Sequence, residues 1–213
     1  MIILGFHTAG PACELALIRG GETVAEKREE MARGQDAKLP GLTSELLFGA
    51  NMDLSDVDRF AVITGPGSFT GIRVGVAFAR GLALATGAPC VGVTTLEASL
   101  PDGQQGSAIV ALPAQRRPPD ITFWTQTFRT GMATGPAIEL AAEDLMGLIN
   151  DRPHMIFGDV EALAPHFKDH ALHAAAPTAA RAAHVAVTLD PDTRSARPTY
   201  ARAPDAALPA QKR

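Results

Sequence analysis

Short apolar runs and amphipathic segments alternate along the first hundred residues and predict a mixed α/β unit. Residues 2–6 and 13–19 are apolar runs of strand length, and Gly20-Gly21 is a two-residue hairpin signal that leads into the segment 22–29. Gly87 followed by Pro89 is a helix stop signal. The other elements predicted in this half are a helix over 35–50, a strand over 59–63, a helix over 69–86 and a strand over 90–93.

The same order of elements recurs after the polar, glycine-rich stretch 101–107. The pattern predicts strands over 108–112, 121–128 and 137–140, a helix over 143–149, a strand over 154–157, then a shorter helix, a short strand and a closing helix over 179–187. Three strands, a helix, a strand and a helix, repeated, are typical of the duplicated α/β fold of the actin-like class (ASKHA, ribonuclease H-like), with two βββαβα units. From element order alone, we therefore expect one subdomain at 1–104 and a second at 105–213.

Composition and charge narrow the classes of function. With 213 residues and 46% hydrophobic content, the chain can bury one large core or two smaller ones. Cys13 and Cys90 lie in separate apolar stretches and are interpreted as buried free thiols. The first residues lack the charged segment of a cleaved leader, and Gly87 and Pro89 break the longest uncharged run. A cytoplasmic protein without a membrane segment is expected.

The formal net charge of −4 provides no overall attraction to nucleic acid. Any contact with tRNA is therefore expected to be indirect, through a partner, or to come from a local basic patch. The tail is the main basic stretch, but Asp190, Asp192 and Asp205 are interspersed in it, which favours a solvated terminus over an RNA-binding arm. Its basic residues are Arg194, Arg197, Arg202, Lys212 and Arg213.

A glycine-rich loop, GPGSFTGIRVG at 65–75, joins the strand over 59–63 to the following helix. Such a loop can direct unpaired amide groups and the positive end of a helix dipole at an anion. The Lys-Ser/Thr pair of a P-loop is absent, however, so the alternative is a tight turn in which Ser68 caps the helix. The candidate residues of a vestigial anion loop are Gly65, Gly67, Ser68, Thr70 and Gly71.

The same segment closely resembles the signature of the TsaB (YeaZ) family, the dimerisation subunit of the bacterial machinery that places threonylcarbamoyl on adenosine 37 of tRNA. The resemblance is carried by the N-terminal hundred residues, and the second half is divergent. The further segments that resemble this family are IILGFHTA at 2–9, RGQDAKLP at 33–40, GVTTLEAS at 92–99 and PTYAR at 198–202.

The resemblance implies that this chain has lost the chemistry of the inter-lobe cleft. Actin-like enzymes hold hydrated magnesium with a carboxylate at the end of the first strand, where this chain has His7, a poor magnesium ligand. The related catalytic family, TsaD, carries a His-x-x-x-His metal pair where this chain has Thr95 and Ser99. We expect no catalytic residue, no metal and no cofactor in this chain.

Three alternatives for chemistry stay open at this stage. A small-molecule kinase or ATPase on the same fold would show ATP turnover that depends on His7 or Ser68. A glycoprotease-type peptidase would use Ser68 as a nucleophile, although the Gly-x-Ser-x-Gly elbow is missing. A metal site at His166, His170 and His173 would require one helix to continue through all three residues.

In relatives of the TsaB family, the first two long helices contact TsaD, and the same surface can support a homodimer. The apolar stripe of the first helix and the small-residue groove of the second are therefore candidates for this interface. The alternative is that these faces pack on the chain's own sheet. The nominated interface residues are Leu39, Leu42, Leu46, Ile72, Gly75, Val76 and Ala79.

The expected function is that of a non-catalytic scaffold. The chain would bind a TsaD-type catalytic subunit as a heterodimer and would be required for threonylcarbamoyladenosine formation at position 37 of tRNAs that read ANN codons. A TsaE-type ATPase would be a third member of the assembly.

Overall fold

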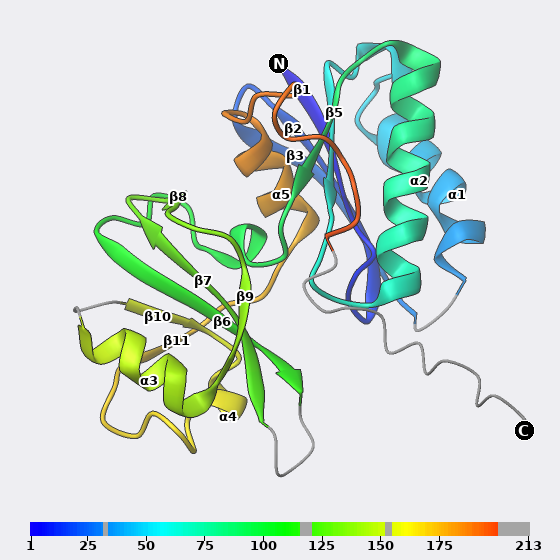
Figure 1. Cartoon of the computed structure of the whole chain (residues 1–213). Helices are drawn as coiled ribbons and strands as arrows, with labels where there is room; N and C mark the ends of the chain where they lie inside the picture. Colours follow the sequence, from blue (N-terminus) through cyan, green and yellow to red (C-terminus); the bar gives the residue numbers. More distant parts are fainter. Residues whose placement is uncertain (32–33, 116–120, 152–154, 200–213) are drawn as a thin grey trace, which may run out of the picture.

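The chain folds into two lobes, each built on its own mixed sheet (Figure 1). The computed structural model describes residues 1–31, 34–115, 121–151 and 155–199. The first lobe contains the N-terminal strands and the two long helices, and the second contains the residues from β6 onward through β11.

The first sheet has the strand order β3-β2-β1-β4-β5. β1 lies at its centre, antiparallel to β2 and parallel to β4, and β4 is parallel to β5. The β2–β3 hairpin turns at Gly20 and Gly21, whose φ angles of 62° and 91° lie in the left-handed region that glycine adopts easily. The strands are β1 Ile2–His7, β2 Ala12–Arg19, β3 Glu22–Glu30, β4 Arg59–Ile63 and β5 Cys90–Val93.

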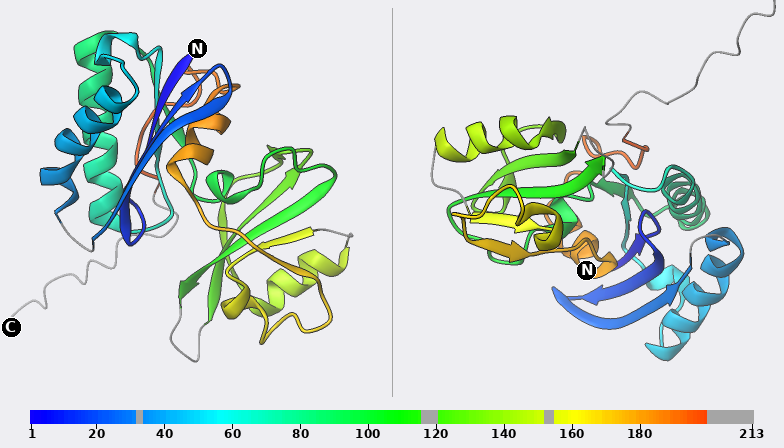
Figure 2. Two further views of the ribbon diagram at one scale, coloured as in Figure 1. Left: turned by 180° about the vertical axis from the view of Figure 1, so that it is seen from behind. Right: turned by 90° about the horizontal axis from the view of Figure 1, so that it is seen from below.

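Helices cover both faces of this sheet (Figure 2). α1 (Gln35–Gly49) and α2 (Phe69–Thr86) lie on one face, and α5 (Ala179–Ala186) lies on the other. Because β1 is covered on both sides, its side chains are buried at nearly every position, which explains its continuous apolar run.

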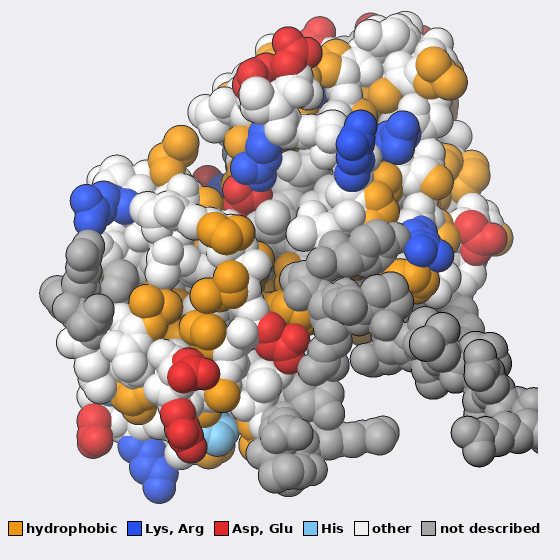
Figure 3. Space-filling model, viewed as in Figure 1, with side chains coloured by type: hydrophobic (Ala, Val, Ile, Leu, Met, Phe, Trp, Pro, Cys, Tyr) orange, Lys and Arg blue, Asp and Glu red, His pale blue; other side chains and the backbone are white. Residues whose placement is uncertain are grey.

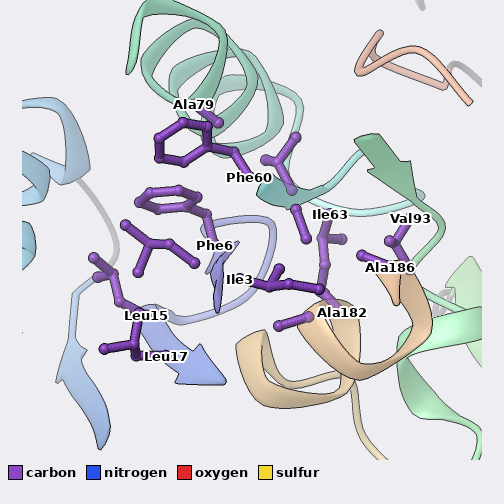
Figure 4. Close-up of a cluster of buried hydrophobic side chains, with 14 of the residues drawn as sticks. Ile3, Phe6, Leu15, Leu17, Phe60, Ile63, Ala79, Val93, Ala182 and Ala186 are labelled. Atoms are coloured by element: carbon purple, nitrogen blue, oxygen red, sulfur yellow. The ribbon is translucent and has the colours of Figure 1, made fainter. Parts of the chain in front are cut away.

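The core of the first lobe has one layer on each side of the sheet (Figure 4). Phe6 and Phe60 point toward Ala79 of α2, whereas Ile3 lies on the side of α5, near Ala182. α5 approaches β1 closely, because a Cβ added at Gly5 would collide with the backbone of this helix. Alanines on α5 allow that approach.

The second sheet has the order β11-β10-β6-β7-β8, with β9 also paired to β7. α3 (Ala142–Asp151) and α4 (Val160–Leu163) belong to this lobe, where Leu145 and Leu163 share a buried cluster with Phe123 and Phe167. The strands are β6 Ser107–Gln115, β7 Thr122–Arg129, β8 Met132–Ala133, β9 Ile138–Ala141, β10 Met155–Gly158 and β11 Leu172–Ala174. Two short 3-10 helices, η1 Leu54–Asp56 and η2 Glu97–Ser99, occupy loops of the chain.

The predicted fold class is confirmed, but one predicted placement is wrong. The helix expected to close the second unit, α5, packs against β1, β2 and β4 of the first sheet. Ala182, Ala183 and Ala186 are buried in the core of the first lobe. The boundary between 1–104 and 105–213 therefore stays a proposal about the order of elements along the chain. In the folded protein, α5 packs in the first lobe.

After α5, the chain returns along the edge of the first sheet. Residues 194–199, called here the C-terminal strap, are attached at both ends. The Gly92 amide donates to the Arg194 carbonyl at 2.9 Å, and the Thr199 amide donates to the Thr64 carbonyl at 2.8 Å. The rest of the resembling PTYAR segment, 200–202, lies outside the described residues.

Candidate functional site

The loop that begins at Gly65 is a tight turn at the start of α2. The Ser68 side chain accepts a hydrogen bond from the Gly71 amide at 3.3 Å, so the predicted helix cap is confirmed. The Ser68 amide donates to the Ala9 carbonyl at 2.8 Å and is therefore already paired. Gly67, Ser68 and Thr70 are exposed, and a role in anion binding stays a prediction.

Glycines in this loop and helix are required by the chain's own packing. A Cβ at Gly71 would collide with the Thr8 carbonyl oxygen, and a Cβ at Gly75 would collide with the Thr8 hydroxyl. The Thr8 hydroxyl also donates to the Gly71 carbonyl at 2.7 Å. The glycines leave room for a close neighbour. In this structure that neighbour is Thr8, directly after β1, instead of a ligand.

His7 is buried at the end of β1, with 3% of its surface exposed. Its Nδ1 has no hydrogen-bond partner among the described residues. Burial, with a smaller effect of Arg28, lowers the pKa of His7 from 6.5 to about 4. The imidazole is consequently neutral at physiological pH, in the place where actin-like enzymes would need an anionic oxygen ligand.

We expect His7 to make folding acid-sensitive. The unfolded chain takes up a proton at His7 below pH 6.5, whereas the folded chain does so only near pH 4, so stability falls as the pH decreases through this range. Between pH 7 and pH 5 the loss from this residue is about 2 kcal/mol. Urea unfolding at the two pH values should show a smaller pH dependence for His7→Gln than for the native chain.

The control for this experiment is His184→Gln. His184 is half-buried, and its Nε2 lies 3.0 Å from the Thr23 hydroxyl, so its loss should leave most of the pH dependence in place. If the free energy of unfolding of His7→Gln fell between pH 7 and pH 5 by as much as that of the native chain, the acid sensitivity would not come from His7.

Thr95 and Ser99, at the place of the metal pair of the TsaD family, use their hydroxyls within the chain. Thr95 donates to the Pro66 carbonyl at 2.5 Å, and Ser99 donates to the Thr95 carbonyl at 2.8 Å. Both side chains are buried. The Thr95 hydroxyl thus joins the segment after β5 to the glycine-rich loop, whereas the Ser99 hydroxyl bonds within that segment.

The histidine alternative is wrong. His166, His170 and His173 each pack against a phenylalanine ring, and His173 lies in β11 instead of continuing a helix. Within the described residues, no group of three or more His, Cys, Asp or Glu side chains is arranged to hold a metal ion. Cys13 and Cys90 are free thiols; Cys13 is buried as predicted, whereas Cys90 is half-buried.

The nominated interface residues are buried in the chain's own core, and their role in a partner contact stays a prediction. Each side chain is at most 8% exposed, and Gly75 is also buried. The alternative, that these faces pack on the sheet, is the one that the structure shows. The residues concerned are Leu39, Leu42, Leu46, Ile72, Gly75, Val76 and Ala79.

Some apolar residues of the two helices are exposed to solvent. Phe48 on α1 is 85% exposed and Leu84 on α2 is 88% exposed. Ala77, Gly81 and Ala85 are also exposed on α2. We call these five residues the outer face. Figure 3 shows apolar side chains along this edge of the molecule.

α2 is unusually apolar for a helix with so much exposed surface. Among the described residues, it is the one helix whose length and composition would also suit a membrane span, yet it packs on β4. Only five of its eighteen residues are buried, namely Gly71, Ile72, Gly75, Val76 and Ala79. An apolar surface of this kind is typical of protein contacts.

Sequence comparisons connect the chain to tRNA modification proteins. Residues 24–114 match the family model described as TsaD: tRNA N6-adenosine threonylcarbamoyltransferase. The tRNA threonylcarbamoyladenosine biosynthesis protein TsaB of Escherichia coli is 38% identical over 96 residues, which are 45% of this chain and 41% of that protein. TsaB of Haemophilus influenzae is 34% identical over 98 residues, 46% of this chain and 41% of that protein. The match thus spans about two fifths of these relatives' length.

Solved structures resemble nearly the whole chain. YeaZ from Pseudomonas aeruginosa superposes with a TM-score of 0.71 at 24% identity, over 93% of this chain and 99% of that chain. A ROK hexokinase from Thermus thermophilus superposes with a TM-score of 0.55 at 14% identity, over 88% and 98%. The two lobes and these neighbours define an actin-like α/β protein.

Within that class of fold, the sequence matches in the first half of the chain indicate one group of proteins. The sequence is similar to proteins named TsaB, at 28–38% identity over about half of the chain, and the fold is that of YeaZ.

Proposed function

We propose that this chain is the non-catalytic scaffold subunit that binds a TsaD-type catalytic subunit during threonylcarbamoyladenosine formation at position 37 of tRNAs that read ANN codons. The observation that carries the proposal is the exposed apolar outer face in a chain with this similarity. A role in threonylcarbamoyladenosine biosynthesis is supported by the similarity to proteins named TsaB.

The outer face has the chemistry of a helix-packing surface. Ala77, Gly81 and Ala85 are small and recur every four residues on α2, so the backbone of a partner helix can approach closely. Phe48 and Leu84 are large and strongly exposed, so they can fill pockets on the partner. The same surface would serve a homodimer when the partner is absent.

Non-catalytic action is supported by how the cleft residues are used. His7 is buried and neutral, the Ser68 hydroxyl caps α2, and the Thr95 hydroxyl bonds to the backbone. The reacting groups would then belong to the partner, and this chain would act through a coupling free energy that favours the active form of the partner. A TsaE-type ATPase would complete the assembly in the cytoplasm.

Reconstitution tests this proposal. Purified TsaD-type and TsaE-type subunits of the same organism are incubated with threonylcarbamoyl-adenylate as the donor, ATP and an unmodified tRNA, with and without the chain. We expect modified tRNA only when the chain is present, and nearly full yield with Ser68→Ala and Thr95→Val. Modification without the chain would contradict the proposal. ATP turnover or proteolysis by the chain alone, lost in Ser68→Ala, would favour the kinase or peptidase alternatives.

A further inference from the structure

A groove of about 640 Å³ lies between α2 and the C-terminal strap, and we call it the arginine groove. α2 lines it with Ala77, Arg80, Gly81 and Leu84, and the strap lines it with Arg197. Ala77, Gly81 and Leu84 also belong to the outer face. A partner subunit that covers the outer face therefore covers one wall of this groove as well.

Arg80 stands on the α2 wall, directly before Gly81. It is exposed and forms no ion pair with any described residue. Burial raises the pKa of the half-buried Cys90 thiol to about 12, and the positive charge of Arg80 acts in the opposite direction, which is consistent with a guanidinium on the groove side of α2. A Cβ at Gly81 would meet no atom within 4 Å, so the groove is open beside Arg80.

Arg197 stands on the strap wall, and Arg194 in the same strap provides a comparison. The Arg194 guanidinium contacts both carboxylate oxygens of Glu97, at 2.8 Å and 2.6 Å. Arg197 is exposed and has no ion pair within the described chain, although the strap is attached on either side of it, at Arg194 and Thr199. The backbone thus holds a second positive charge at the groove without neutralising it.

Two guanidinium groups without counter-charge restrict what can cover this surface. No acidic residue is among the described residues that line the groove. When a partner covers Leu84 and Gly81, it also removes water from the neighbouring arginines, and a guanidinium that loses water without gaining an anion is strongly unfavourable. A covering protein must therefore supply negative charge here. A carboxylate fits this need because it accepts two parallel hydrogen bonds from one guanidinium.

We propose that the arginine groove receives an acidic segment of the TsaD-type subunit, whose Asp or Glu side chains pair with Arg80 and Arg197. Leu84 and the small residues of α2 then form the apolar centre of the contact, and the two arginines form its charged rim, as is usual in protein interfaces. The strap is a third segment of this interface, beside α1 and α2. The inference rests on the proposed function, which supplies the partner.

The test is the affinity of the TsaD-type subunit for this chain, measured by titration calorimetry at several salt concentrations. Arg80→Gln/Arg197→Gln removes both charges and should bind about tenfold more weakly at low salt, for two partly exposed ion pairs. The difference from the native chain should shrink at high salt, because salt screens such pairs. The control Arg19→Gln/Arg129→Gln removes two exposed arginines elsewhere and should bind like the native chain.

A variant that keeps the charge identifies the acidic residues of the partner. Arg80→Lys/Arg197→Lys should bind within a few-fold of the native chain, and it places amines that a carbodiimide joins to adjacent carboxylates as amides. We expect mass spectrometry to find an Asp or Glu of the TsaD-type subunit joined to position 80 or 197. The native chain has no amine side chain at these positions and serves as the blank.

The other outcomes overturn the inference. If the glutamine variant binds the subunit like the control at every salt concentration, no carboxylate of the partner faces the arginines. If it binds the subunit normally but the complex loses affinity for a tRNA transcript, the groove faces RNA. If the lysine variant binds the subunit but gives no cross-link to it, the acidic segment lies elsewhere. A failure of the proposed function would differ, because the native chain would then form no complex at all.

Discussion

Gly71→Ala is expected to destabilise the protein by about 3 kcal/mol or more, a large part of the stability of a domain of this size. The added Cβ would collide with the Thr8 carbonyl oxygen, which is backbone and cannot rotate away. Relief would require α2 to separate from the end of β1, and the hydrogen bond from Thr8 to Gly71 would be lost. The gain in helix propensity from alanine, about 1 kcal/mol, is too small to compensate.

Gly81→Ala is the matched control on the same helix. No atom lies within 4 Å of a Cβ at Gly81, so this variant should be more stable than the native chain by about 1 kcal/mol. Urea or thermal unfolding of the two variants measures the difference. Equal stability of both variants would show that the contact between α2 and Thr8 is not needed for folding.

Leu84→Asp is expected to weaken binding to a TsaD-type subunit while folding is preserved. Leu84 is 88% exposed, so a charge there costs little in the free protein but would be buried without a partner in the complex. We expect a loss of about 2 kcal/mol or more, which is about 30-fold in Kd. Phe48→Asp should act in the same direction, because its ring is 85% exposed and belongs to the outer face.

The control for both variants is Val24→Asp. Val24 is an apolar residue that is 44% exposed on the edge strand β3 and is not part of the outer face. Titration calorimetry with the three variants and the native chain gives the affinities, and the unfolding temperature checks folding. Native affinity in Leu84→Asp and Phe48→Asp would place the interface elsewhere.

Much of the first lobe could be predicted from the sequence because its signals are local. The Gly20-Gly21 turn, the cap at Ser68 and the stop at Gly87 each determine a boundary through backbone conformation or a nearby hydrogen bond. The position of α5 could not be predicted in the same way. An alanine-rich helix has no local signal for which sheet it covers, and its contacts with β1 and β2 join distant segments.

Hydrophobic periodicity identifies the face of a helix that the core requires, and the residues nominated for the interface are buried in that way. Leu39 and Val76 belong to apolar stripes that are buried in the core of the first lobe. Phe48 and Leu84 lie outside the stripes and look like isolated apolar residues in sequence. Their exposure to solvent is what marks them as candidates for a contact surface, and exposure can be determined only from a structure.

The arginine groove shows a second limit of sequence reasoning. The tail is interpreted as a solvated terminus, whereas residues 194–199 are attached to the sheet through Gly92 and Thr64. Arg80 and Arg197 come from segments far apart in the chain, so only the fold brings them to one groove. The free thiols and the chemistry of His7, in contrast, follow from residue type and burial.

Photo-cross-linking from the outer face tests the central claim most directly. A photoreactive amino acid is placed at position 84, or at position 138 as a control, where Ile138 is 44% exposed on the second lobe. The proteins are irradiated with the TsaD-type subunit of the same organism. We predict a covalent adduct with that subunit from position 84 and none from position 138. Adducts from position 138 alone, or from neither position, would contradict the proposal that this chain works by binding its partner through the outer face.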